Sequence, residues 1–315
     1  MEIKYRIIAP NISPQIDRDQ QKVLVNPYQG CTHNCLFCPA NGGFLQKKAF
    51  SDYRLHGTVS VVENIVSILR MTYPEAETNR MVHLSPVADP FQPAEAIFGL
   101  SESVVNYCKE KKIPIAICTK GIIPNRVIEK LADIPNSFVQ LSIPTINEQK
   151  HRAIVRGDGA SLTQLFMQVE ALRDRNIPVI GRIDPIFPYI TDDLEELSAL
   201  VGKLKKLGAC CILSSIADIS DGMLESEAAF LNGIETNLYS RYAELYSEKI
   251  NGRWHANIEY RESVLSKLQK ICQDEDISFG VTWEPDSAGN SINDSFSYIG
   301  TKDTFSKKHI ERTRE

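Results

Sequence analysis

Residues 26–39 read NPYQGCTHNCLFCP, and they place Cys31, Cys35 and Cys38 on one short segment with the spacing C-x3-C-x2-C. The segment directly follows Val23–Asn26, a short apolar run that predicts a buried strand. Three thiolates on a tight loop can bind three irons of a 4Fe–4S cube and leave the fourth iron open to an outside ligand. We therefore predict an iron–sulfur site immediately after a strand.

Two other interpretations of these cysteines stay open from spacing alone. His33 could complete a zinc site, although zinc normally needs a second ligand pair and no other C-x2-C or H-x3-H pattern occurs in the chain. The cysteines could also be core residues that lie close together by coincidence. Gly30 favours a ligand loop, because glycine lets the backbone turn sharply out of a strand.

Length, composition and charge exclude several classes of protein. The chain has 315 residues, of which 43% are hydrophobic, so it can bury a full core. No apolar run approaches the ~18 residues of a membrane span and the first residues lack a signal-peptide layout, so we expect a cytoplasmic protein. A net charge of −5 argues against dominant phosphate contacts. Clustering of three of the eight cysteines indicates a metal rather than a disulfide scaffold.

Strand-like and helix-like segments alternate from residue 23 to residue 215. This alternation predicts parallel strands with helical crossovers, and six such units suit an α/β fold of the partial (βα)6 TIM-like barrel type. The predicted strands are Val23–Asn26, Met81–Ser85, Ile113–Cys118, Phe138–Ile143, Val179–Ile183 and Cys210–Ser214. The predicted helices are Val59–Met71, Glu102–Lys111, Pro124–Ala132, Leu162–Arg175 and a stretch from Leu194 to Leu207.

The alternation loosens beyond Ser215, which suggests three parts. We expect an N-terminal extension at 1–22, the partial barrel at 23–215 and an α-rich C-terminal extension at 216–315 that covers the barrel mouth. Within the last part we predict an acidic loop at 220–225, helices near 227–249 and 260–274, and a strand at 277–281.

Polar motifs follow several of the predicted strands, where chemistry collects in such barrels. Residues 83–95 read HLSPVADPFQPAE, and their three prolines predict either a rigid platform for a ligand or a plain connector. Lys120 follows the third strand, and Ser142 ends the fourth. Arg182 and Asp184, two residues apart on the fifth, share one face, so they could bind a carboxylate or the substrate, or pair with each other.

The pattern N-P-Y-x-G-C-x3-C-x2-C resembles the radical SAM superfamily and, more narrowly, its spore photoproduct lyase-like group, over roughly residues 20–215. The resemblance implies that S-adenosylmethionine binds the open iron of a 4Fe–4S cluster. An external one-electron reductant of the flavodoxin or ferredoxin type would drive its cleavage to a 5′-deoxyadenosyl radical, which abstracts hydrogen from a substrate.

The resemblance also implies cofactor-binding residues. A serine, a lysine and a serine at comparable strand ends of the group map onto Ser85, Lys120 and Ser142, and residues 83–95 are similar to its D-P-Y-Q-P-x-E stretch. Hydroxyl groups can hydrogen-bond the amine or ribose, and an ammonium can pair with the carboxylate. Taken alone, Lys120 reads more simply as a surface charge. Arg182 is a further cofactor candidate, and no catalytic residue is identified.

Two departures separate the chain from the lyase itself. Phe37 and Pro39 stand where the lyase has tyrosines, and residues 83–89 contain no cysteine to serve as its hydrogen-atom donor. We therefore expect a peptide substrate, such as a ribosomally made precursor, or a small metabolite, with the lyase, transferase or isomerase type left open. The alternative is DNA-lesion repair or another nucleic-acid modification, for which no basic, aromatic-lined run is evident.

Remaining patterns support no second activity. A non-catalytic redox sensor would need the cluster cysteines but not the three strand-end residues. Tyr239, Tyr242 and Tyr246 recur at helical spacing and predict a packing stripe, while Cys108 and Cys272 read as buried thiols rather than ligands of a second cluster. A separate substrate-recognition protein is a possible partner, because no small peptide-binding domain is evident.

Overall fold

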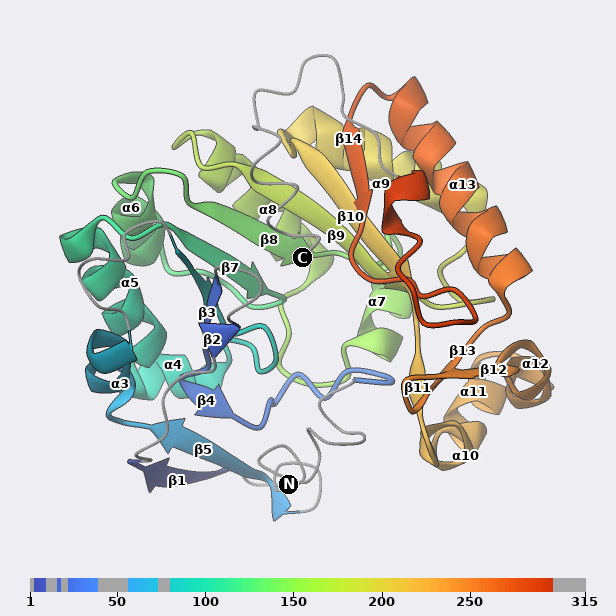
Figure 1. Ribbon diagram of the computed structural model, residues 1–315, viewed down its shortest axis with the longest axis horizontal. Helices are drawn as coiled ribbons and strands as arrows, with labels where there is room; N and C mark the ends of the chain where they lie inside the picture. The colour runs from blue at the N-terminus through green and yellow to red at the C-terminus, as the bar shows by residue number, and fades with distance from the viewer. Residues whose placement is uncertain (1–2, 10–15, 18–21, 39–55, 73–79, 297–315) are drawn as a thin grey trace. The chain divides into compact units, whose positions relative to one another are not determined.

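The computed structural model describes residues 3–9, 16–17, 22–38, 56–72 and 80–296 (Figure 1). Contacts divide the chain into two compact units, each of which is described by itself. The first unit comprises Met1–Cys35, Lys47–Ser142 and Val155–Ile180. The second comprises Leu36–Gln46, Ile143–Ile154 and Gly181–Glu315.

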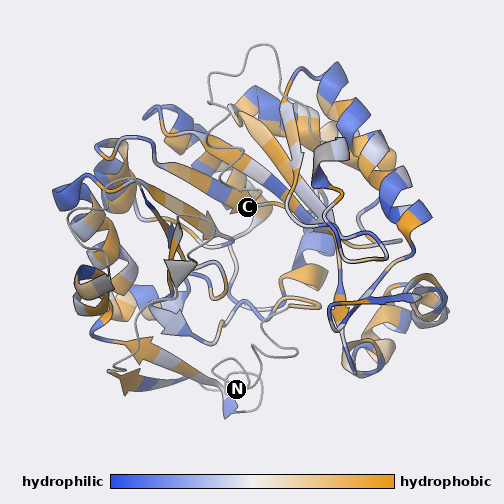
Figure 2. Cartoon of the chain, viewed as in Figure 1, coloured by the Kyte–Doolittle hydropathy of each residue, from blue (hydrophilic) through white to orange (hydrophobic). Residues whose placement is uncertain are grey.

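The first unit is built on a mostly parallel sheet with the strand order β8-β7-β6-β3-β2. One row of the register runs from Val25 through Leu84 and Ile117 to Val139, so the carboxyl ends of four strands lie at the same edge. Apolar residues dominate β6, β7 and β8, as strands buried on both faces require (Figure 2). The strands are β2 (Ile16–Asp17), β3 (Lys22–Val25), β6 (Met81–Leu84), β7 (Ile115–Thr119) and β8 (Phe138–Ser142).

A smaller sheet of the first unit corrects one prediction. Residues 59–62, assigned to a helix at 59–71, form most of β5 (Thr58–Val62), which pairs with β1 (Lys4–Ile8) and β4 (Tyr28–Gln29). The helical prediction was wrong there because four residues of TVSVV are β-branched and fit a buried strand. The helices of this unit are α3 (Ile65–Thr72), α4 (Pro93–Phe98), α5 (Leu100–Lys111), α6 (Asn125–Ala132) and α8 (Leu162–Arg173).

The second unit continues the α/β pattern with the strand order β14-β10-β9. The strand predicted near 277–281 pairs in parallel with β10, with Cys211 opposite Ser278. Asp193 caps the amino end of α9 (Leu194–Leu207), and Gly208 ends that helix in a left-handed conformation. These elements are α7 (Glu148–Ile154), β9 (Val179–Ile186), α9 (Leu194–Leu207), β10 (Cys211–Ile216), α13 (Ile258–Asp274), β14 (Ser278–Val281) and the 3-10 helix η3 (Asn293–Phe296).

Residues 219–255 differ most from expectation. Helices occur near 227–249 as predicted, but Asn237, in a left-handed conformation with φ 65°, separates two short ones, and residues 248–249 belong to a strand. The loop predicted at 220–225 is partly helical. Asn251 and Gly252, both with positive φ, form the tight turn of a hairpin that the sequence analysis overlooked. The elements are β11 (Ile219–Ser220), α10 (Met223–Ser226), α11 (Ala228–Ile234), α12 (Leu238–Leu245), β12 (Glu248–Ile250) and β13 (Arg253–His255).

Among the described residues, no helix is both long and apolar enough to cross a membrane. The proposed part boundaries at 22/23 and 215/216 stay predictions. Of the N-terminal extension, residues 3–9 contain β1, which the sequence analysis did not assign.

Candidate active site at the cysteine loop

The cysteine loop follows β4 and turns repeatedly. Gly30, Asn34 and Phe37 have positive φ values of 92°, 46° and 49°. The backbone therefore turns sharply at three positions around the cysteines. Cys31, Cys35 and Cys38 are in the thiol form, and all three are partly exposed. This donor set fits the 4Fe–4S cluster expected from the spacing, with one thiolate for each of three irons.

The described residues at the loop do not form the ligand set that the zinc alternative requires. In the part of the chain that the structure describes, no three His, Cys, Asp or Glu side chains converge to hold a single metal ion. A cube takes one thiolate per iron, so its ligands need not meet at one point as those of zinc do. His33, the alternative zinc ligand, is buried and lies with its Nδ1 3.4 Å from a carboxylate oxygen of Asp89.

One side of the loop is held by the segment after α7. The amide of Gly157 donates to the carbonyl of His33 at 2.9 Å, and the Arg156 side chain donates to the carbonyl of Asn34 at 3.3 Å. A Cβ atom at Gly157 would lie 1.8 Å from the carbonyl oxygen of Thr32. Only glycine therefore permits this close approach of two backbones.

The other side of the loop is held by Gln92. Its Nε2 donates to the carbonyl of Gly30 at 3.1 Å and to that of Asp89 at 3.2 Å, and its Oε1 accepts from the amide of Thr32 at 3.2 Å. The side chain is only 1% exposed. A neutral amide thus satisfies backbone groups on both sides of Cys31.

Asp89 connects the loop to the end of β7. Its carboxylate accepts from the hydroxyl of Thr119 at 2.7 Å and from the amide of Lys120 at 2.6 Å. Burial lowers the pKa of His33, and the neighbouring Asp89 carboxylate does not overcome this, so the imidazole is neutral. The 83–95 segment is therefore more than a connector: it fixes the loop and a strand end together.

The last acid of that segment, Glu95, anchors the strand before the loop. Its carboxylate accepts from the hydroxyl of Tyr28 at 2.5 Å and from the amides of Ser101 and Glu102 at 2.9 Å each. Burial, followed by the Glu95 charge, raises the pKa of Tyr28, so its hydroxyl remains a donor. In the sequence, Asp89, Gln92 and Glu95 are members of the 83–95 motif, and only the folded structure shows their individual roles.

The structure brings Ser85, Lys120 and Ser142 to the carboxyl ends of three neighbouring strands, β6, β7 and β8. Ser85 has φ 56° and is 4% exposed, and its hydroxyl has no hydrogen-bond partner among the described residues. Lys120 is partly exposed, and its charge helps to lower the pKa of His33, so it lies near the loop. Ser142 is buried at the end of its strand. Their role in cofactor binding stays a prediction.

Arg182 forms an ion pair with Asp184 within the second unit, so the simplest of the three readings of this pair occurs in the structure. Asp184 also accepts hydrogen bonds from Ser215 and, at 3.2 Å, from Thr282. The carboxylate thereby has several partners in addition to the guanidinium. A contact of Arg182 with the cofactor remains a prediction.

Phe37 is an anchor that the sequence analysis treated only as a departure from the lyase pattern. Its ring centroid lies 6.4 Å from that of Phe187 and 5.9 Å from that of Tyr242, in aromatic packing geometry. Tyr242 is itself fixed, because its hydroxyl donates to the carbonyl of Pro188 at 2.7 Å. The residue beside Cys38 is thus held by aromatic packing.

Three of the cysteines outside the loop are buried in the core. Cys108, Cys211 and Cys272 are fully buried, and burial raises the pKa of the Cys108 and Cys272 thiols. A thiol with a raised pKa is a poor nucleophile and a poor metal ligand. The interpretation of Cys108 and Cys272 as ordinary buried thiols agrees with this.

Residues 25–201 match the radical SAM superfamily. The chain belongs to this superfamily, and it is an enzyme that uses a 4Fe–4S cluster and S-adenosylmethionine. The predicted α/β class with a mostly parallel sheet, as in the partial TIM-like barrel of these enzymes, is confirmed. Enzymes of the superfamily require a reductant, as the sequence analysis expected.

Three known proteins show how far the likeness extends. A protein of Mycobacterium tuberculosis without an assigned function is 26% identical over 232 residues, which are 71% of this chain and 67% of that protein. The radical SAM Nalpha-GlyT isomerase of Pseudomonas phage M6 is 28% identical over 180 residues, 56% of this chain and 36% of the phage protein. A solved spore photoproduct lyase superposes with a TM-score of 0.61 at 8% identity, over 86% of this chain and 79% of its own, and therefore shows a shared fold alone.

Proposed function

We propose that this radical SAM enzyme abstracts a hydrogen atom from a peptide, such as a ribosomally made precursor, or from a small metabolite. When bound, the cluster and S-adenosylmethionine supply a 5′-deoxyadenosyl radical by one-electron reductive cleavage. The proposed cluster ligands are Cys31, Cys35 and Cys38. The proposed cofactor contacts are Ser85, Lys120, Ser142 and Arg182.

The observation that carries the proposed cofactor site is the hydroxyl of Ser85. A buried polar group without a hydrogen-bond partner destabilises the folded state by roughly 1–3 kcal/mol. The position of this hydroxyl at a strand end therefore supports a ligand as its partner. The amine or ribose of S-adenosylmethionine can supply that partner. Lys120 adds an ammonium close to the cysteine loop. An ammonium is suited to pair with the carboxylate of the cofactor.

Charge supports the proposed substrate class. The chain carries a net charge of −5, and residues 216–250 hold seven acidic and two basic residues, a local net charge equal to that of the whole chain. Four of these acids, Asp218, Asp221, Glu235 and Glu248, form ion pairs with basic residues, so the negative charge left over is small. The acidic chain as a whole still favours a basic peptide over a phosphate backbone. A separate recognition protein remains compatible with this proposal.

A second candidate, modification of a nucleotide, has one observation in its favour. A solved spore photoproduct lyase that shares the fold holds a dinucleoside photoproduct. The two candidates differ in a measurable way, because oligonucleotide binding weakens steeply as salt neutralises phosphate contacts. Submicromolar binding of lesion-containing oligonucleotides near 150 mM salt, with lesion-dependent release of 5′-deoxyadenosine, would establish the second candidate instead.

The cluster is tested by anaerobic reconstitution. The wild-type protein should contain about four irons and four sulfides and should cleave S-adenosylmethionine when reduced. Alanine at Cys31, Cys35 or Cys38 should abolish the visible absorbance and the cleavage, whereas Cys210→Ala, which lies outside the loop, should leave both intact. Zinc without iron in the wild-type protein would contradict the assignment.

A further inference from the structure

A pocket of about 350 Å³ opens in the second unit, within residues 219–254. It lies at the lower end of the range of roughly 300–1,000 Å³ that is typical of ligand pockets. None of the residues of the proposed cluster site lines it. Its lining residues from α10, α12 and the adjoining sheet include Leu224, Glu225, Tyr239, Tyr246, Ser247 and Trp254.

Two of the aromatic walls are fixed in place. Tyr246 is 4% exposed and stacks on Tyr242 with a centroid separation of 5.3 Å, and its hydroxyl donates to the carbonyl of Ala217 at 2.8 Å. The indole of Trp254 donates to the Asp221 carboxylate at 2.7 Å. A ligand would therefore meet rigid rings, which lowers the entropic cost of binding.

The Trp254 ring already lies close to a cation of the chain itself. The ammonium of Lys249 is 5.2 Å from the ring centroid, within the distance of about 6 Å at which cations and aromatic faces attract. Asp221 accepts from this ammonium at 2.7 and 2.8 Å, and these hydrogen bonds, with that from Trp254, lower the pKa of Asp221. This part of the wall already binds the chain's own ammonium, so the charge available to a ligand is that of Glu225.

Glu225 supplies a negative charge at the same pocket. It is exposed, and among the described residues it forms no ion pair. Tyr239, the third member of the tyrosine stripe, is only partly buried and lines the pocket rather than completing the packing of Tyr242 and Tyr246. Aromatic faces and a carboxylate together favour a ligand with an apolar stem and a cationic end.

The adjoining sheet has an edge strand with which an extended peptide can pair. In the order β11-β13-β12, strand β12 is an edge strand, and it begins directly after the pocket residue Ser247. An edge strand offers backbone groups with which an extended peptide can pair. A peptide paired there could place a side chain in the pocket.

We propose that this pocket binds the arginine or lysine side chain of a peptide substrate. The side chain is a recognition anchor and not the reacting residue. This inference rests on the peptide class proposed above and adds that the peptide carries a basic residue. The carboxylate of Glu225 in the pocket lining complements such a ligand.

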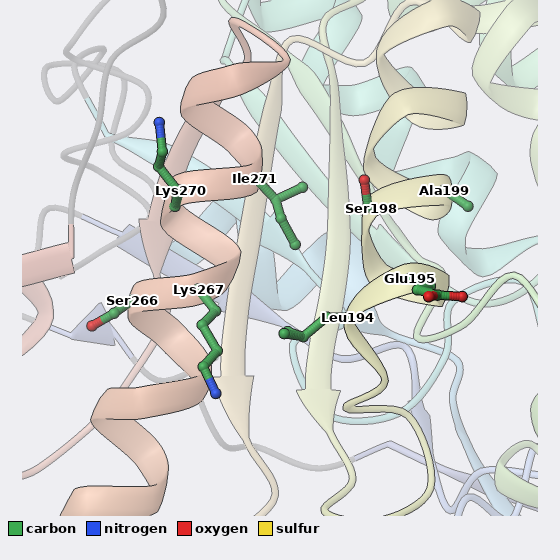
Figure 3. A pocket seen from close by; sticks show the side chains of 8 residues that line it. All are labelled: Leu194, Glu195, Ser198, Ala199, Ser266, Lys267, Lys270 and Ile271. Carbon is green, nitrogen blue, oxygen red and sulfur yellow. The ribbon is translucent and has the colours of Figure 1, made fainter.

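A larger hollow of the same unit does not fit this ligand. About 750 Å³ lies between α9 and α13, where Leu194 and Ile271 project into the gap (Figure 3). Its lining sets Lys267 and Lys270 against the single carboxylate of Glu195 and holds no aromatic side chain, so it offers a cation neither net negative charge nor an aromatic face. This contrast makes the smaller, aromatic pocket the site for a basic side chain.

Trp254 provides the readout, because the chain has two tryptophans and the other, Trp283, is half exposed. Trp283→Phe leaves Trp254 as the sole tryptophan reporter. The probes are the peptide Gly-Gly-Arg-Gly-Gly, its uncharged citrulline counterpart, and N-acetylarginine amide. We expect saturable fluorescence changes with the arginine peptide, at least tenfold weaker binding of the citrulline peptide, and weaker binding of the amide.

Matched variants locate the binding. Glu225→Gln should weaken binding of the arginine peptide about tenfold, whereas Glu244→Gln, which removes an exposed charge from α12 outside the pocket lining, should not. Equal binding of the two peptides, equal effects of the two variants, or an amide as tight as the peptide would overturn the proposal. Cleavage of S-adenosylmethionine without substrate should be unaffected in both variants, so failure of the radical chemistry is distinguishable from failure of this pocket.

Discussion

Two buried polar side chains, Gln92 and Arg261, each hold several backbone atoms, but with different chemistry. The neutral amide of Gln92 makes three hydrogen bonds around the cysteine loop of the first unit. Arg261, fully buried in the second unit, donates to the carbonyls of Ala256 and Pro285 at 2.7 and 2.6 Å. It also pairs with Glu284 at 3.0 Å and Glu248 at 2.8 Å.

The difference predicts which property each region loses when the side chain of Gln92 or Arg261 is removed. Loss of an uncharged partner leaves a few backbone groups unsatisfied, whereas loss of one member of a buried ion pair leaves charge without compensation. Variants around the cysteine loop should therefore affect cofactor assembly first. Variants around Arg261 should affect the free energy of unfolding first.

The largest effect is expected from Gly157→Ala. The added Cβ would lie 1.8 Å from the Thr32 carbonyl oxygen, so the cysteine loop has to shift. Iron bound per protein after reconstitution should fall close to background. Gly233→Ala is the control, because a Cβ there meets nothing within 4 Å and a helical alanine is favourable by roughly 0.5–1 kcal/mol. Normal iron content in the Gly157 variant would show that the loop is not held as described.

Arg261→Met should lower the free energy of unfolding by about 3–5 kcal/mol, because the Glu284 carboxylate loses its buried counter-charge. Burial raises the pKa of Glu284 to about 7 from 4.5, so the folded state prefers the protonated acid and stability falls as pH rises between these values. The loss should accordingly be smaller at pH 5 than at pH 8. Denaturant titration at both pH values measures it, and a loss independent of pH would contradict the role of Glu284.

The sequence located the first region better than the second for a physical reason. Three cysteines at fixed spacing and polar residues at strand ends are local patterns, and the strand ends of a parallel sheet meet at one edge. Gly157 carried no such signal, because its need for glycine comes from a backbone contact with Thr32, more than a hundred residues away in the chain. Sequence spacing cannot reveal a contact of that kind.

In the second region, helical spacing and turn-forming residues occur in the same stretch of sequence and predict different structures. Apolar and polar residues at 227–249 recur with helical spacing, but Asn237 and the Asn251–Gly252 turn break the chain into short elements. Arg261 looks like an ordinary surface residue of a helix, since only the folded structure places two acids and two carbonyls around it. The roles of Ser85, Lys120, Ser142 and Arg182 with the cofactor stay predictions.

Gln92→Ala should have a smaller effect on stability than Arg261→Met. It leaves the amide of Thr32 and the carbonyl of Gly30 without their side-chain partner, at a cost of roughly 1–3 kcal/mol. We expect reduced iron content and a lower melting temperature of the cofactor-free protein. Gln149→Ala, at an exposed position of α7, is the control. If both variants assembled the cluster equally well, Gln92 would be no positioning residue.

The smallest effect on stability, and the most diagnostic one, is expected from Ser85→Ala. The cofactor-free protein loses a buried hydroxyl that has no partner in the part of the chain that the structure describes, so the free energy of unfolding should stay unchanged or rise slightly. Ser101→Ala removes a buried hydroxyl that donates to the carbonyl of Pro90 at 2.7 Å, and it should lower the free energy of unfolding by about 1 kcal/mol. Binding of S-adenosylmethionine to the reconstituted protein should weaken several-fold in the Ser85 variant alone. A stability loss at Ser85 equal to that at Ser101, with unchanged cofactor affinity, would mean that the Ser85 hydroxyl serves the fold and not the cofactor.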